Sequence, residues 1–168
     1  TRAELDGKYF REHGGSMYVE LFPNGPFLGV SANGERVAHV RSFLDGPKAP
    51  SMVVTVLGAG GDTIFSRSYP FTPAPLPRAV ADSAVSAFIT SVLARRPELK
   101  GVLRDVPTPA IHPPVADVVI GNEGDVWIQL RDTAAGRRYL VLDADGDPTG
   151  VLTVPLNARV AAVGHGSV

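Results

Sequence analysis

The chain contains no cysteine, and this absence excludes disulfide bonds and metal sites built on thiolates. It also lacks a strong charge of either sign, because the formal net charge is -1 and the charged residues are scattered along its 168 residues. Without a basic field, binding to nucleic acid or to an anionic membrane surface is not expected. No apolar run reaches the roughly 18 to 20 residues of a bilayer-crossing helix, so no membrane-spanning segment is expected.

Motifs for catalysis, metal binding and nucleotide binding are missing as well. No histidine has a second ligand at a spacing typical of a metal site, and no serine lies in a G-x-S-x-G elbow. Gly58–Gly61 is glycine-rich, but neither a helix nor a GK[ST] sequence follows it, which disfavours phosphate binding. We therefore predict no catalytic residue, no metal ligand and no cofactor. The histidines assessed in this way are His13, His39, His112 and His165.

Asp143–Asp147 superficially resembles the start of a calcium-binding loop. The EF-hand pattern needs D-x-D-x-D-G followed by a glutamate six residues after the glycine. Here Gly146 comes early and Leu152 stands where the glutamate would be, so we interpret the segment as a hairpin turn. Three further features are interpreted structurally: Trp127, the only tryptophan, as a core residue of a strand, and the pairs Arg95–Arg96 and Arg137–Arg138 as solvated positions.

Glycine and proline are abundant, with 18 and 15 residues, and they lie between short apolar runs as turn residues do. Runs of this kind occur in two groups of four. Asn33-Gly34 between two such runs is a strong hairpin signal, because both residues tolerate positive φ. The predicted strands are 27–31, 35–42, 52–57 and 63–68 in the first group, and 116–120, 125–130, 137–142 and 150–154 in the second.

The two groups repeat the same order of strands and turns, with about 40 residues in each. A repeat of about 40 to 45 residues with four strands is typical of a β-propeller blade. Several runs, such as 52–57, are apolar on both faces, as expected where each sheet lies between two neighbouring sheets. The predicted fold class is therefore all-β: a partial β-propeller whose four-stranded antiparallel blades, 27–68 and 116–154, stack face to face.

Residues 70–115 break the pattern and predict a helical insertion. Ala81, Val85, Phe88 and Val92 fall on one face of a helix over about 78–95, which Pro97 ends. A second short helix is predicted over 98–105. These helices are expected to pack through their apolar faces, and Phe88→Ala should cost about 3 kcal/mol if that ring is buried. The packing residues predicted are Val85, Phe88, Ile89, Val92, Leu99 and Leu103.

The run from Tyr69 to Asp132, followed by "YLVLDADGDPTGVLTVP", resembles a bacterial family of six-bladed β-propellers related to the NHL and TolB types. The shared elements are a strand before a proline-rich stretch, an amphipathic helix, "HPPV", "G-x-V-W" and "V-L-D-x-D-G". The likeness covers roughly residues 25–168. It implies six blades, so that about half of the ring lies outside this chain. It also implies export to the periplasm or cell surface, and it supplies no catalytic residues.

The segments at the two ends read as parts of further blades. Residues 1–22 are expected to end a preceding blade, and 159–168 to begin the next one, so that the chain is one section of a larger propeller domain. In that case the outer faces of the terminal blades lack neighbours, and the chain by itself is expected to be marginally stable or to associate. The apolar residues expected on those faces are Val19, Leu21, Val160 and Val163.

Two hypotheses for function remain open. One is a non-enzymatic binding or scaffold module that recognises a protein or small-molecule ligand through the propeller or its helical insertion. The other is a propeller enzyme, such as a metal-dependent lactonase or lyase, whose site lies largely on blades outside this chain. Two or more convergent His, Asp or Glu side chains at the ends of the inner strands would favour the enzyme.

Overall fold

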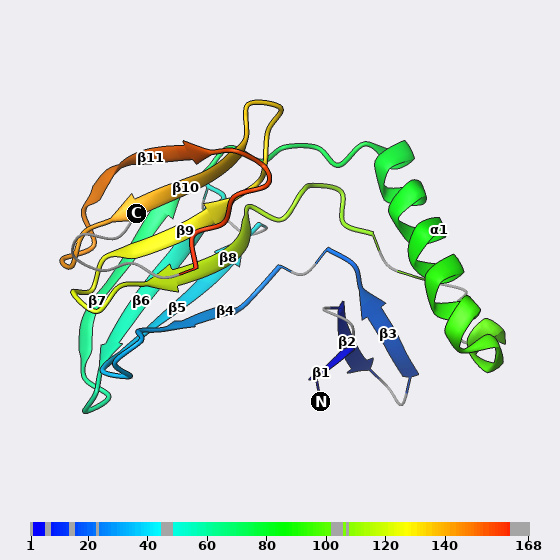
Figure 1. Ribbon diagram of the computed structural model, residues 1–168, viewed down its shortest axis with the longest axis horizontal. Helices are drawn as coiled ribbons and strands as arrows, with labels where there is room; N and C mark the ends of the chain where they lie inside the picture. Colours follow the sequence, from blue (N-terminus) through cyan, green and yellow to red (C-terminus); the bar gives the residue numbers. More distant parts are fainter. Residues whose placement is uncertain are drawn as a thin grey trace. The chain divides into compact units, whose positions relative to one another are not determined.

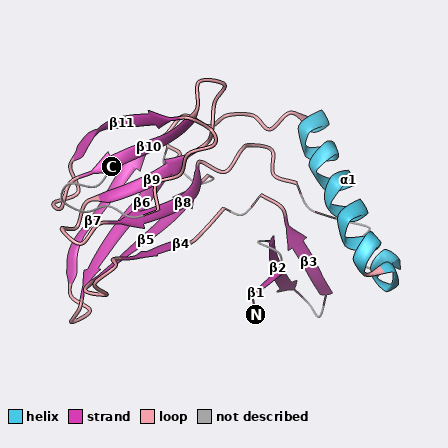
Figure 2. Cartoon of the chain, viewed as in Figure 1, coloured by secondary structure: helices cyan, strands magenta, loops and turns pink. Residues whose placement is uncertain are grey.

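The chain forms two compact units in the computed structural model (Figure 1). One contains residues Thr1–Pro23 and Ala74–His112, and the other contains Asn24–Pro73 and Pro113–Val168. Strands make up most of the regular structure (Figure 2). The structure describes residues 2–5, 8–13, 16–22, 24–44, 49–101, 106 and 108–161.

The larger unit contains two four-stranded antiparallel sheets, each a simple meander. Both predicted meanders are confirmed, with strand ends shifted by one or two residues. The first sheet runs in the order β4 (Phe27–Val30), β5 (Arg36–Phe43), β6 (Ser51–Gly58) and β7 (Thr63–Pro70). The second runs in the order β8 (Val115–Ile120), β9 (Val126–Leu130), β10 (Arg137–Leu142) and β11 (Pro148–Val154).

Burial alternates along the central strands with the period of two that a pleated strand imposes. In β6, Met52, Val54 and Val56 are buried, whereas Val53 and Leu57 are only half-buried. The apolar runs were expected to be covered on both faces, so the half-buried second face of β6 differs from that expectation. The two sheets pack together as predicted, and they share one apolar core. Its members are Ala38, Val40, Met52, Val54, Val56, Phe65 and Tyr69 from the first sheet, and Val115, Val118, Ile120, Val126, Ile128 and Leu142 from the second.

The smaller unit contains a three-stranded antiparallel sheet in the order β1 (Arg2–Leu5), β2 (Lys8–His13) and β3 (Ser16–Glu20). Only the third of these strands was predicted, as part of the run 17–22. Two extended segments in the same unit pair through a bridge between Pro75 and Ile111. The backbone N–H of Leu76 donates to the carbonyl of Ala110 at 3.0 Å, which ties the start and end of the inserted segment together.

The predicted first helix is confirmed as α1 (Arg78–Arg95), and it is followed by a short 3-10 helix, η1 (Pro97–Gly101). A second helix was predicted over 98–105. The 3-10 helix covers the first part of this range, and residues 102–105 lie outside the described residues. No helix among the described residues is long and apolar enough to cross a membrane.

The apolar face of α1 is less buried than predicted. Ala81 is its buried residue, while Val85, Phe88, Ile89 and Val92 are half-buried. Leu99 of η1 is also half-buried, and Leu103 lies outside the described residues. We therefore expect Phe88→Ala to cost about 1 kcal/mol in thermal or chemical unfolding rather than about 3, because part of the ring already contacts solvent. A loss of about 3 kcal/mol would show that the ring is buried in solution.

Candidate functional site

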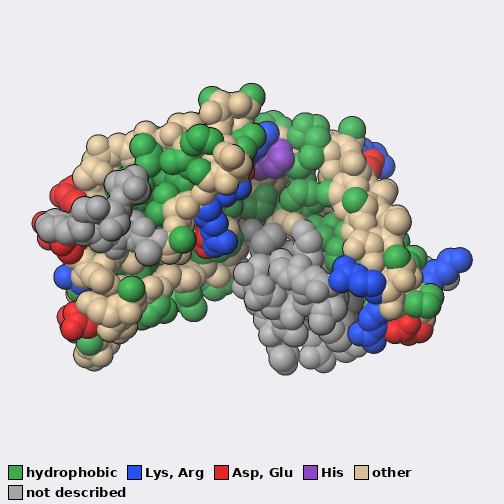
Figure 3. Space-filling model, in the orientation of Figure 1, with side chains coloured by type: hydrophobic (Ala, Val, Ile, Leu, Met, Phe, Trp, Pro, Cys, Tyr) green, Lys and Arg blue, Asp and Glu red, His purple; other side chains and the backbone are tan. Residues whose placement is uncertain are grey.

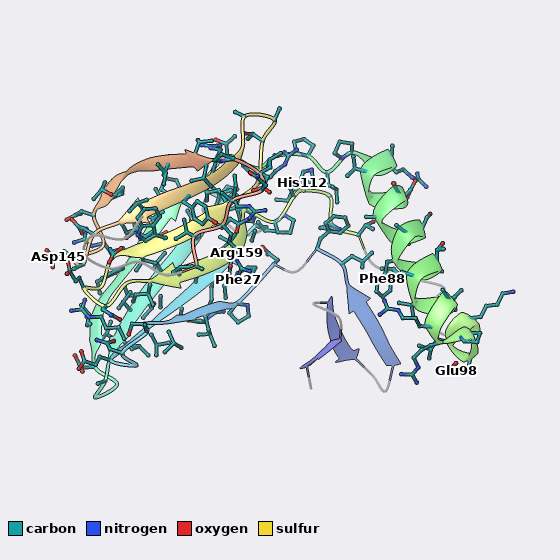
Figure 4. All side chains as sticks on the ribbon, in the orientation of Figure 1. Phe27, Phe88, Glu98, His112, Asp145 and Arg159 are labelled. Carbon is teal, nitrogen blue, oxygen red and sulfur yellow. The ribbon has the colours of Figure 1, made fainter. Side chains whose placement is uncertain are left out.

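Among the described residues, no histidine belongs to a group that could hold a metal ion. His39 lies half-buried in β5, and His112 lies half-buried where its backbone N–H donates to the carbonyl of Ala74 at 2.9 Å (Figure 4 labels His112). His13 is in β2, and His165 lies outside the described residues. Within the described part of the chain, no group of three or more His, Asp or Glu side chains could hold a metal ion.

The acidic segment Asp143–Asp147 forms the turn between β10 and β11, as predicted. The Oδ1 of Asp143 accepts hydrogen bonds from the backbone N–H groups of Asp145 and Asp147, at 3.0 and 2.8 Å. The carboxylate of Asp147 pairs with Arg67 of β7. Acidic side chains gather at this end of the sheets, where the tight turns lie (Figure 3). Asp143 and Asp147 therefore have structural partners in the turn and in the neighbouring sheet.

Trp127 is half-buried in β9 rather than fully in the core. Its ring packs edge-on against Tyr139, with centroids 6.3 Å apart, and its Nε1 donates to the carboxylate of Asp125 at 2.6 Å.

The prediction that Arg137 is solvated was wrong. Its side chain is only 22% exposed, since it lies 3.5 Å from Asp132 and donates to the carbonyl of Ala158. Arg95 and Arg96 are exposed, as predicted.

The two sheets of the larger unit repeat each other, and the likeness includes individual hydrogen bonds in their turns. In the β6–β7 turn, Gly58 N–H donates to Asp62 O and Gly61 N–H donates to Gly58 O. In the β10–β11 turn, the same two bonds join Asp143 to Asp147 and Gly146 to Asp143. Both hairpins also carry a bulge at the equivalent place, after Val56 in β6 and after Val141 in β10.

The first hairpin of each sheet repeats in the same way. Ser31 N–H donates to Arg36 O in the β4–β5 turn, and Gly121 N–H donates to Asp125 O in the β8–β9 turn, which is one residue shorter. Aligning these bonds gives an equivalent in the second sheet for each strand residue of the first. The pairs used below are Leu28 with Val118, Gly29 with Val119, Val30 with Ile120, Ala38 with Trp127, His39 with Ile128, Val54 with Tyr139, Thr55 with Leu140 and Val56 with Val141.

These equivalences show that the two sheets use opposite faces to pack together. We call face A the face that carries Ala38, Val54 and Val56 in the first sheet, and Trp127, Tyr139 and Val141 in the second. Face B is the opposite face. The core joins face A of the first sheet to face B of the second. The core residues on face B of the second sheet are Val115, Val118, Ile120, Val126, Ile128 and Leu142, and Leu130 and Leu140 pack against them.

The two sheets approach most closely along β4 and β8. A Cβ on Gly29 would lie only 3.0 Å from the carbonyl oxygen of Val118, so no side chain fits there without movement. Towards β7 the side chains on face A become larger, and Tyr69 reaches across to donate a 2.5 Å hydrogen bond to the carbonyl of Gly146. The gap between the sheets is therefore filled by glycine and alanine at β4 and β5 and by aromatic rings at β7.

The two outer faces of the sheet pair, face B of the first sheet and face A of the second, differ in how far they are covered. On face B of the first sheet, Leu28 is 67% and Val30 62% exposed, whereas their equivalents Val118 and Ile120 are 5% and 3% exposed. Sequence reasoning missed this surface. Aligning the turns pairs Leu28 with Val118 and Val30 with Ile120, but the sequence does not show which of the two pairs is exposed.

Face A of the second sheet is partly covered by residues 155–161, which we call the strap. Arg159 of the strap pairs with Asp117 of β8 at 2.5 Å, and the N–H of Val160 donates to the hydroxyl of Tyr139 at 3.2 Å (Figure 4 labels Arg159). The expectation that Val160 and Leu21 are exposed was wrong, because Val160 is half-buried and Leu21 is buried. Val163 and the side chain of Val19 lie outside what the structure describes.

Tyr69 makes the contact between β7 and the second sheet sensitive to alkaline pH. Burial raises the pKa of Tyr69, Arg67 opposes this, and Asp147 and Asp143 add to the rise. The unfolded chain ionises near pH 10 while the folded phenol still holds its proton, so stability is full below about pH 10 and falls as pH rises beyond it.

We expect Tyr69→Phe to cost about 1 kcal/mol at neutral pH, because the bond to Gly146 is lost. The variant should also lose less stability than wild type above about pH 10. Urea unfolding at neutral pH and again above pH 10 measures both effects. An equal alkaline loss in the variant and in wild type would contradict the role of Tyr69.

Comparisons with protein-family models, with curated proteins and with solved structures each gave no match to this chain.

Proposed function

We propose that this chain is a section of a β-propeller and works as a non-enzymatic binding or scaffold module. The observation that carries the proposal is the head-to-tail packing of two equivalent sheets, face A on face B. Packing of this kind can continue beyond two members, because face B of the first sheet is exposed and face A of the second sheet is only partly covered by the strap. A propeller is the architecture in which four-stranded sheets stack in this way around a ring.

The closeness of β4 to β8 supports a ring rather than a straight stack. Glycine and alanine lie at the narrow side, and the rings of Phe65 and Tyr69 lie at the wide side. The two sheets lie close together at the edge formed by β4 and β8 and farther apart at the opposite edge. Further sheets added in the same way would be arranged around the close edge, so β4 and β8 would line the axis of the ring. A six-bladed ring, with residues 1–22 and 159–168 in neighbouring blades, extends this proposal. Residues 159–161 are irregular, and 162–168 lie outside the described residues.

Binding is preferred over catalysis because three of the carboxylates at the turns and strands of the larger unit already serve structural contacts. Asp147 pairs with Arg67, Asp117 pairs with Arg159, and Asp125 accepts from Trp127. The ligand we propose is a protein or a small molecule, and the family likeness in the sequence supports a bacterial protein at the periplasm or cell surface. Among the described residues, no cluster of His, Asp or Glu side chains favours the lactonase or lyase alternative.

Electron microscopy of the protein at its natural length tests the architecture. The expected result is a disc with a central hole, in which β4 and β8 face the axis. A compact two-sheet sandwich without a central hole would overturn the propeller and, with it, this assignment.

Metal addition separates the binding module from the metal-dependent enzyme. We expect the melting temperature to stay unchanged when Ca2+ or Zn2+ is added at millimolar concentration and when EDTA follows, because a ligand stabilises a fold only where the folded state binds it. A rise in melting temperature that EDTA reverses would favour the enzyme instead.

A further inference from the structure

Face B of the first sheet carries apolar residues along β4 and polar residues across the other strands, among them His39, Arg41, Thr55 and Ser66. Leu28 and Val30 of β4 are largely exposed, and Ile64 of β7 is 41% exposed. Across the middle of the face, His39 and Thr55 stand where the second sheet has Ile128 and Leu140. In the second sheet this same face is buried against its neighbour, so the exposed residues occupy positions that a packed sheet covers.

We propose that face B of the first sheet binds face A of the second sheet in another copy of this chain. The inference rests on the same sheet repeat as the proposed function, and it concerns the chain of 168 residues by itself, without the further blades that the proposed function places beside these two faces. The partner is argued from the interface already present. Within one chain, face A of one sheet packs against face B of the other, and each chain also has one face of each kind left at its two outer sides. When a molecule carries two different surfaces that fit each other, copies join head to tail into a ring or a filament.

The receiving surface on the second copy is face A of β8–β11. Its strap is held near Asp117, Arg137 and Tyr139, which lie at one end of the strands. Towards the turns, Trp127 and Val141 are half-buried and so remain partly open to a partner. At the closest point of the existing interface Gly29 meets Val118, and in the proposed one Val119 meets Leu28. Val119 has a side chain where Gly29 has none, so copies approach less closely and bind more weakly than the two sheets within one chain.

Sedimentation velocity over a range of concentrations measures the association. The wild-type chain should associate reversibly. The double variant Leu28→Glu, Val30→Glu should weaken association at least tenfold. Its matched control is Val80→Glu, which changes a similarly exposed valine on α1 and should leave association unchanged. Circular dichroism and thermal melting must show that both variants remain folded. A wild type that stays monomeric, or a double variant that associates as wild type does, overturns the proposal.

A gain-of-function variant adds a test that misfolding cannot imitate. His39→Ile with Thr55→Leu gives the first sheet the face B residues that the second sheet buries, so association should strengthen about tenfold, which is about 1.4 kcal/mol. Unchanged or weaker association in a folded variant overturns the proposal.

Crosslinking through introduced cysteines shows which faces of two copies meet. Because the chain has no cysteine of its own, only the introduced thiols can react. A Leu28→Cys copy mixed with a Val119→Cys copy should be joined by a short bismaleimide. Crosslinks between two Leu28→Cys copies at equal yield would indicate a symmetric face-to-face dimer instead. A Leu28→Cys thiol that resists labelling in the monomer would show that the copy covers its own face B. Either result overturns the proposal, while a ring seen by microscopy would leave the proposed function standing.

Discussion

Leu142→Ala is expected to lower the free energy of unfolding of the chain by about 3 kcal/mol. Leu142 is fully buried on face B of β10, in the core that face A of the first sheet shares. The β10 bulge lies directly before it, and its backbone pairs with Val126 on one side and Pro148 on the other. Because both neighbours are held by the sheet, the core cannot collapse into the space that the substitution leaves.

Urea unfolding followed by fluorescence of the single tryptophan measures this loss. Leu156→Ala is the matched control, because Leu156 is 52% exposed after β11 and its truncation should change stability by less than about 0.5 kcal/mol. Equal losses in the two variants would mean that the two sheets do not share a packed core in solution.

The eight strands of the larger unit could be predicted because their signals are local. Each tight turn has a glycine at positive φ, as at Gly34, Gly61, Gly124 and Gly146, and each lies between short apolar runs. A hairpin needs only its own turn and flanking strands to be recognised. The first helix was predicted for a similar reason, since its apolar period and Pro97 both lie within one short segment.

The strands β1 and β2 were missed because their residues do not carry such a signal. Lys8–His13 holds two aromatic residues and four polar or charged ones without alternation, so pairing with a neighbouring strand decides its conformation. Arg137 was wrongly taken as solvated for a related reason. The groups that surround it, Asp132 and the carbonyl of Ala158, come from other segments that the sequence pattern does not place beside it.

The candidate surface required the structure for a different reason. Apolar runs at 27–30 and 115–120 look alike in sequence, and only the packing shows that one is exposed on the face that the other buries. Which side of a strand is covered depends on its neighbours and register, and a strand's own residues do not specify them.

Gly146→Ala is expected to cost about 3 kcal/mol, because it combines two separate penalties. Gly146 has a φ of 84°, a conformation that costs an alanine about 1 kcal/mol. Its new Cβ would also lie 2.8 Å from the ring carbons of Phe65, and moving a packed ring costs about 2 kcal/mol more. The turn cannot shift freely, since the carbonyl of Gly146 accepts the hydrogen bond of Tyr69.

Gly34→Ala separates the two penalties, because Gly34 has a similar φ of 75° but nothing within 4 Å of the new Cβ. It should therefore cost only about 1 kcal/mol. In a Phe65→Leu background the ring is gone, so Gly146→Ala should cost about as little as Gly34→Ala does, and a double-mutant cycle by urea unfolding measures the difference. If Gly146→Ala costs the same with and without the ring, then the β10–β11 turn does not press against β7. In that case the rings of β7 would not fill the gap between the two sheets at the edge opposite β4 and β8, and the proposed ring geometry depends on that filling.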